Sequence, residues 1–325
     1  MATKKRAAAQ GTRRRLSLSR ASNVSGNQMM LGKMPALTAA ARLEAMGDKG
    51  SARQLRSAVR SMNKNPQFAK VAAKWFEPKA YQWTEHAHGY VPNDAKDSGE
   101  GISIVSALTI EADATLKASP IKITLDTLRT FQYPGGGEHQ VLFNFEGQHQ
   151  TTDADQQSVK FAQTYRARDT TGAGVSGYPI FTGLRPPAEG VMFSIKTTNV
   201  RSSSDQKILT FLGSGVFKEG LKLASAANPV VPIVAGFATG IADAFARRND
   251  DAVVQEFLLG LDFSSSKSRA KLREGVYISV QVPDAAAWNW ADFRFRESQV
   301  VLKGSPTKRP PVNYVIFSVS KVAAK

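Results

Sequence analysis

The sequence predicts a mainly β protein, with an antiparallel β-sandwich or jelly-roll body that contains an inserted helix and follows a basic, partly helical N-terminal arm. Two observations support this fold class. From residue 102 onward, apolar residues recur with a period of two, in short runs separated by Gly, Pro and Ser. Residues 1–80 hold 17 of the 43 lysines and arginines but only three of the 27 acids, and so account for +14 of the net charge of +16.

The N-terminal arm is expected to divide into two parts. Residues 1–37 are predicted to be disordered, because Lys and Arg stand among Ser, Ala, Gly and Asn with few large apolar residues. Residues 38–76 are predicted to form basic amphipathic helices. Gly47 and Gly50 would end the first helix, and Ser51 is a plausible N-cap for the second. A third helix is expected to begin at Pro66.

The charge of this arm predicts a polyanionic partner, since Lys and Arg that gather on one segment neutralise dense phosphate. Nucleic acid and an anionic membrane surface both fit, and a solvated helix face is the third interpretation. The candidate polyanion-binding residues are Lys4, Lys5, Arg6, Arg13, Arg14, Arg15, Arg20, Arg53, Arg56, Arg60, Lys64, Lys70 and Lys74.

Residues 77–101 are predicted to be a linker, because Pro, Gly, His and Asn are frequent in them. Residues 102–325 are predicted to form the sandwich. Its strands are expected at about 102–109, 121–125, 141–145, 159–168, 190–200, 208–212, 276–282, 299–302 and 314–319.

A helical insertion is expected at about 215–250. Its helix would cover 229–246, where apolar residues recur every three or four positions and Asp243 is the one charge from 223 to 246. Pro232 and Asp243 shorten the apolar run to about ten residues, below the roughly 20 that span a bilayer. A buried packing helix is therefore favoured over a membrane-active element.

No motif predicts catalysis, a cofactor or a metal site. Without cysteine, disulfides, thiol nucleophiles and thiolate metal ligands are all excluded. The pair His86 and His88, with Glu85 or Asp94 as a third ligand, is interpreted as part of the linker. The remaining candidates are interpreted as ordinary structure: His139 and His149, the loop acids Asp126, Asp153, Asp155 and Asp169, an incomplete phosphate loop at 215–220, and the ring and arginine series Trp288, Trp290, Phe293, Arg294, Phe295 and Arg296.

Residues 120–321 resemble the accessory β-rich region that follows the protease domain in some bacterial caspase-like proteins. The likeness rests on VLFNF at 141–145, GYPIF at 177–181, FLLGLDF at 257–263, LREGVY at 272–277 and NYVIFSVS at 313–320. It implies a β-rich fold and no catalytic residues, since the protease domain with its His and Cys is absent. In layout alone, a basic arm before a β-sandwich is similar to coat proteins of small RNA viruses.

We therefore expect a non-enzymatic assembly or scaffold protein whose basic arm binds nucleic acid without sequence specificity, RNA in preference to DNA, and whose body forms homo-oligomers. The alternative is an effector or adaptor that uses the basic helices and the 229–246 helix at an anionic membrane. No signal peptide is recognised at the start, which predicts a cytoplasmic protein or one assembled in a particle.

Overall fold

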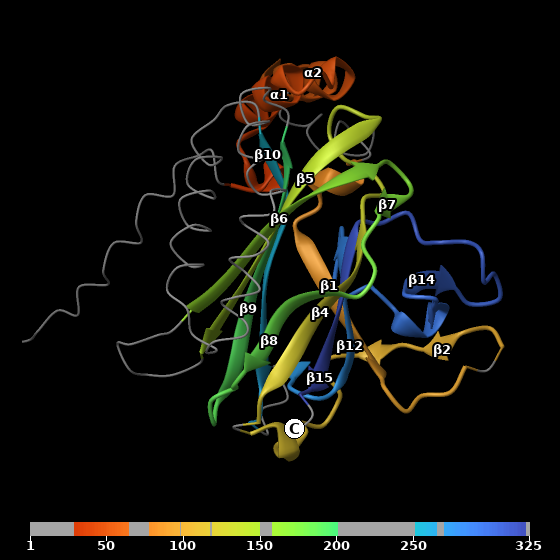
Figure 1. Ribbon diagram of the computed structural model, residues 1–325. Coiled ribbons are helices and arrows are strands. Elements are labelled where there is room, and N and C mark those ends of the chain that lie inside the picture. The colour runs from red at the N-terminus through yellow and green to blue at the C-terminus, as the bar shows by residue number, and fades with distance from the viewer. Residues whose placement is uncertain are drawn as a thin grey trace, which may run out of the picture.

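The computed structural model describes residues 29–64, 78–97, 99–117, 119–149, 158–200, 251–264 and 270–322. In these ranges two six-stranded sheets pack face to face, a three-stranded sheet lies outside one of them, and two helices lie at one end (Figure 1). The predicted mainly β, sandwich-like fold is therefore confirmed.

Sheet I is antiparallel throughout and has the strand order β3-β1-β12-β15-β4-β8. Its strands are β1 (Glu85–Pro92), β3 (Val105–Ser106), β4 (Ile121–Arg129), β8 (Tyr178–Leu184), β12 (Gly275–Val282) and β15 (Tyr314–Lys321).

Sheet II has the order β11-β10-β9-β5-β6-β7 and is antiparallel except where β11 joins β10. Its strands are β5 (Glu138–His149), β6 (Ser158–Arg168), β7 (Gly172–Ala173), β9 (Gly190–Val200), β10 (Ala252–Asp262) and β11 (Ala270–Lys271). The chain passes between sheets I and II from β4 to β5, from β7 to β8, from β8 to β9 and from β11 to β12.

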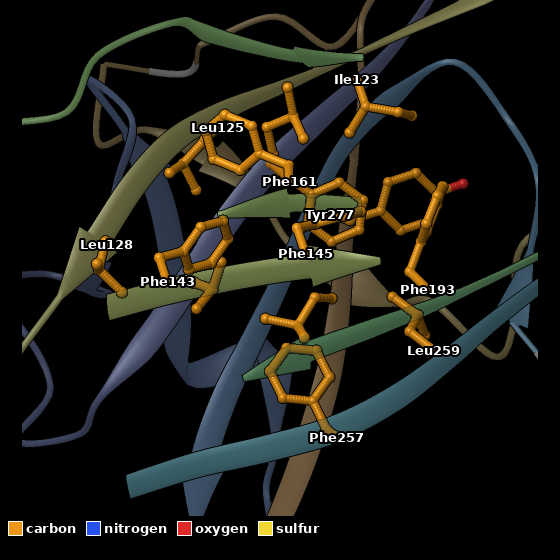
Figure 2. Close-up of a cluster of buried hydrophobic side chains, with 14 of the residues drawn as sticks. Ile123, Leu125, Leu128, Phe143, Phe145, Phe161, Phe193, Phe257, Leu259 and Tyr277 are labelled. Carbon is orange, nitrogen blue, oxygen red and sulfur yellow. The ribbon is translucent and has the colours of Figure 1, made fainter. Parts of the chain in front are cut away.

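The main core lies between sheets I and II and is rich in aromatic rings (Figure 2). Phe145 of β5 is at its centre, with ring centroids 5.0 Å from Phe193 of β9 and 5.4 Å from Phe317 of β15. Tyr277 of β12 stacks on Phe317 at 5.4 Å. These rings come from both sheets, so burying them holds the two layers together.

A second core covers the other face of sheet I. Sheet III is formed by β14 (Gln299–Leu302), β13 (Phe293–Arg296) and β2 (Ile102–Ser103), and its Phe293 belongs to the same buried cluster as Ile278 and Ile316 of sheet I. Strands β12 and β15 are therefore buried on both faces, at every position from Tyr277 to Val282 and from Tyr314 to Phe317. The remaining short elements are the 3₁₀ helices η2 (Leu31–Lys33), η4 (Ala80–Gln82), η5 (Ala114–Leu116) and η7 (Trp290–Asp292).

The linker predicted at 77–101 is wrong for residues 85–92, which form β1 and pair with β12 along their whole length. The residues that suggested a loop, His86, His88 and Gly89, lie inside this strand. A Cβ on Gly89 would lie 2.7 Å from the Ile104 side chain and 2.8 Å from Trp290, so only glycine fits beneath sheet III. The strand expected at 102–109 is also divided, because β2 belongs to sheet III and β3 to sheet I.

The disorder predicted for residues 1–37 is wrong for 29–37. Met30 and Leu31 are buried, and Met30 forms a bridge with Val253 of β10. A Cβ on Gly32 would lie 2.0 Å from the carbonyl oxygen of Gln82, so a glycine lets this segment lie against η4. Residues 1–28, the strand predicted at 208–212 and the insertion predicted at 215–250 lie outside the described residues.

Candidate nucleic-acid interface

The candidate polyanion-binding residues that the structure describes all lie on one helix, α2 (Lys49–Lys64). They are Arg53, Arg56 and Arg60, together with Lys64 at the last position of the helix. The other nine, and the third predicted helix, lie outside the described residues: Lys4, Lys5, Arg6, Arg13, Arg14, Arg15, Arg20, Lys70 and Lys74.

A tight corner joins α2 to the preceding helix, α1 (Ala36–Ala45). Gly47, at φ 80°, ends α1, and the NH of Asp48 donates to the carbonyl of Leu43 at 2.8 Å, as in a Schellman motif. Asp48 then caps α2, since its Oδ1 accepts from the NH of Ser51 at 3.1 Å. The stop at Gly47 was predicted correctly. The N-cap predicted at Ser51 is wrong, because Asp48 fills that role and Gly50 lies inside α2.

The same aspartate fastens the helix corner to the body. Its Oδ2 lies 2.8 Å from the hydroxyl of Tyr81 and 3.4 Å from Lys79 Nζ, and the Tyr81 hydroxyl also lies 3.0 Å from Ser51 Oγ. Burial raises the pKa of Asp48, but the hydrogen bonds from Tyr81 and Ser51 outweigh it and hold the pKa below the ordinary value. The carboxylate is therefore charged at neutral pH, and both of its oxygens have hydrogen-bond partners.

Apolar contacts and one buried arginine complete this attachment. Leu43 of α1 and Ala52 of α2 belong to the main core together with strand residues of both sheets. Arg42, which is 6% exposed, donates from Nη1 to the carbonyl of Asp251 at 3.0 Å. The helix pair is thus part of the sandwich fold, so its outer surface has a fixed position on the body.

That outer surface has a cationic stripe, formed by Lys49, Arg53, Arg56 and Arg60. Their spacing of four, three and four residues places them within about 60° of one another around the helix and along about 16 Å of its axis. Lys49, Arg53 and Arg60 are exposed, and Arg56 is half-buried on the side facing α1. Residues 29–64 contain seven lysines and arginines and only two acids, Glu44 and Asp48.

The cations of the stripe form few ion pairs with acids of the described residues. Within the part of the chain that the structure describes, Arg53 and Arg60 form no ion pair, whereas Arg56 Nη2 is ion-paired with Glu44 Oε2 of α1. The hydrogen bond from Arg56 lowers the pKa of Glu44, and the charge of Lys49 lowers it further. Both side chains of the pair still reach solvent, with 36% of the Arg56 side chain and 49% of the Glu44 side chain exposed.

The histidine pair of the expected linker lies on β1, with both rings turned toward Phe257 of β10. The ring centroids of His86 and His88 are 4.6 and 5.6 Å from that of Phe257. His88 Nδ1 is 2.9 Å from Ser279 Oγ, and the buried Nε2 of His86 has no hydrogen-bond partner. Burial lowers the pKa of His86 to about 3 and that of His88 to about 4, so both are neutral at pH 7.

The other titratable candidates have separate structural roles. His139 Nε2 is 2.9 Å from Asp169 Oδ1, which also accepts from the NH of Tyr133 at 3.1 Å. Burial raises the pKa of Asp126 on β4 to about 6. His149 ends β5, while Asp153, Asp155 and residues 215–220 lie outside the described residues. Across the described ranges, no three His, Asp or Glu residues come together as a metal site would require.

The ring and arginine series at 288–296 forms part of the second core. Trp288 stacks on Phe293 with centroids 4.4 Å apart, and Trp290 meets Trp288 edge-on at 5.8 Å. Arg294 donates to the carbonyl of Phe293 at 2.7 Å. These rings belong to one apolar cluster with residues of sheet I, and only residues 293–296 of the series form a strand, β13, while Trp290 begins η7.

Comparison with protein-family models, curated proteins and solved structures finds no match to this chain. Neither of the two α-helices in the described ranges is long and apolar enough to cross a membrane, and the predicted 229–246 helix lies outside those ranges.

Sequence reasoning missed three residues that shape the stripe. Lys49 extends it by one turn, and its spacing of four residues from Arg53 was visible in the sequence. Glu44 lies on the other helix, and Asp48 fixes the corner, so neither role follows from the periodicity of α2.

Proposed function

We propose that this chain is a non-enzymatic assembly or scaffold protein that binds nucleic acid through its basic N-terminal region without reading the sequence, and whose β-sandwich body packs against further copies. The observation that supports this best is the cationic stripe of α2. It holds one lysine and three arginines along about 16 Å of a helix that is fixed to the body at both its cap and its apolar face.

The chemistry of the stripe suits phosphate. Arginine keeps its charge at every physiological pH, and its planar group donates two parallel hydrogen bonds to phosphate oxygens. Contacts of this kind position a backbone but do not identify bases, so binding is expected to be independent of sequence. The seven cations before residue 21 would add to the same electrostatic attraction.

RNA is the preferred ligand in this proposal, because a basic arm before a β-sandwich is the layout of small RNA-virus coat proteins. In this proposal, copies of the sandwich body pack against one another in a closed, symmetric shell or scaffold. Light scattering of the chain with and without RNA tests this part. A monomer under both conditions would contradict the assembly role.

The test of binding uses the full chain with labelled 20-nucleotide oligo(U), a 20-bp DNA duplex and vesicles containing phosphatidylserine, across a series of salt concentrations. Dissociation constants for oligo(U) should rise steeply with salt. Arg53→Gln with Arg60→Gln should weaken binding and reduce the salt slope by about 1.4, or about 0.7 per lost contact. Both side chains are exposed, so the fold should be unaffected.

A second full-length variant replaces the seven cations at positions 4, 5, 6, 13, 14, 15 and 20 by Gln and separates the arm from the stripe. The proposal predicts that each variant loses part of the salt slope. Binding to vesicles alone would support the membrane alternative instead, and weak binding to all three ligands would contradict any polyanion partner.

A further inference from the structure

Within the described ranges, one acid of the same chain is in direct contact with the cationic stripe, Glu44. Its Oε2 is ion-paired with Nη2 of Arg56, the third of the four cations. The positive charge of Lys49, the first cation, also lowers the pKa of Glu44, so the carboxylate interacts electrostatically with two cations of the stripe. It comes from α1, the helix against which α2 packs, so the corner at Gly47 and Asp48 sets its position.

A carboxylate in this place resembles a bound phosphate. Both are oxyanions that accept hydrogen bonds from a guanidinium group, and an Arg56 nitrogen that donates to Glu44 is not free to donate to a ligand. The ion pair of Glu44 with Arg56 is also weak enough for a phosphate group to replace the carboxylate. Both side chains are more than a third exposed, and exposed pairs of this kind contribute little because water and salt screen them.

We propose that Glu44 is an intramolecular competitor for the phosphate backbone: it occupies Arg56 in the free protein and gives way when nucleic acid binds. This inference rests on the proposed function and adds to it a residue that regulates the affinity for nucleic acid. The free protein presents Arg53 and Arg60 to a ligand, while Arg56 becomes available only after Glu44 is displaced. Glu44 thereby lowers affinity and reduces the number of counterions released on binding.

The alternative is a purely structural pair that steadies the helix corner. The two roles predict opposite effects of removing the carboxylate. A competitor, once neutralised, leaves a tighter binder with an unchanged fold. A structural link, once lost, leaves a less stable helix pair and weaker binding.

The experiment compares Glu44→Gln, Arg56→Gln and the double variant with the unmodified full chain, using the same oligo(U) across a salt series. Glu44→Gln should tighten binding about two- to five-fold at low salt. It should also steepen the salt slope by about 0.7, since one more contact forms without a prior ion pair to break. In the Arg56→Gln background, Glu44→Gln should lose most of its effect, because the two residues act as a pair.

Glu297→Gln is the matched control. It also removes one acid from an exposed pair with an arginine, Arg296, at 3.6 Å, but on sheet III, away from the helix pair (Figure 1). A general effect of net charge would change both variants equally. The inference predicts a larger gain for Glu44→Gln.

Each outcome supports or overturns one statement. If the unmodified chain does not bind oligo(U), the proposed function fails first. If it binds, but Glu44→Gln behaves like Glu297→Gln, the competitor role is wrong while the proposed function stands. A lower melting temperature with weaker binding of Glu44→Gln would also overturn the competitor role and assign the pair to the fold.

Discussion

Acidification is expected to destabilise this fold through His86 and His88. Both rings lie between β1 and β10 against Phe257, and the Nε2 of His86 has no partner that could stabilise a proton. Burial is the main cause of the lowered pKa of His86, and the neighbouring titratable groups His88 and Lys33 lower it further, since a positive charge on either repels a proton on His86. Burial therefore keeps both rings neutral well below the pH at which an unfolded histidine takes up its proton.

The size of the effect follows from the two pKa values. The folded values are about 3 for His86 and about 4 for His88, against 6.5 when unfolded. The two neutral histidines make their full contribution to the unfolding free energy above pH 6.5. This contribution falls below pH 6.5, because only the unfolded chain binds these protons. Between pH 7 and pH 5, each histidine costs about 2 kcal/mol, so the pair costs about 4 kcal/mol of unfolding free energy.

Asp126 acts in the opposite direction. Its folded pKa, raised by burial to about 6, makes the folded protein bind a proton below pH 6 that the unfolded chain does not bind. This adds up to about 1.4 kcal/mol of stability at pH 5. The net loss from pH 7 to pH 5 is therefore expected to be about 3 kcal/mol, a large part of the 5–15 kcal/mol typical of a folded domain.

Urea unfolding followed by tryptophan fluorescence at pH 7 and pH 5 measures this loss. The double variant His86→Asn with His88→Asn has its own stability at pH 7, and the relevant quantity is its change with pH. The loss should disappear in the double variant, leaving the small gain from Asp126. A double variant that loses as much stability on acidification as the unmodified chain would refute the assignment to these histidines.

Two further changes test the attachments described above. Asp48→Ala removes the α2 cap and the contacts with Tyr81, and should cost about 2–3 kcal/mol in thermal unfolding; a change below 0.5 kcal/mol would show that the corner does not depend on this carboxylate. Phe145→Ala should cost about 3–5 kcal/mol in urea unfolding, because Phe145 is fully buried at the centre of the core. Leu258→Ala, at a side chain 62% exposed, is the matched control and should change stability by less than about 0.5 kcal/mol; equal losses would contradict the location of the core.

Much of the sandwich could be predicted because its strands alternate. Strands β4, β5 and β6 place apolar residues on the main core at every second position, and the sequence shows this period directly. Strands β12 and β15 were also predicted as short apolar runs between turn residues, although both of their faces are buried. That second burial depends on sheet III, which no local pattern reveals.

The strands that were not predicted lack the alternation of apolar and polar residues that normally indicates a strand, or contain residues that are typical of loops. β8 contains Pro179 and Gly183 and is an edge strand, where such residues are tolerated. β10 holds a run of apolar residues with little alternation. β1 contains two histidines and a glycine that normally indicate a loop, and only its pairing with β12 and the approach of Trp290 explain them.

The candidate interface was predicted in part. Three arginines on the second helix follow from composition and helical period, and they lie in a single stripe on α2. The sequence could not show that Arg42 turns inward to Asp251 or that Glu44 reaches Arg56, because both contacts depend on how the helices pack. Tertiary contacts therefore decide which cations remain available to a ligand.

The most direct test of the account is the salt dependence of oligo(U) binding by the full chain and by the Arg53→Gln and Arg60→Gln double variant. The account predicts a steep slope for the full chain that falls by about 1.4 in the variant. An identical slope for both proteins would show that the stripe on α2 does not contact phosphate and would contradict the proposed interface.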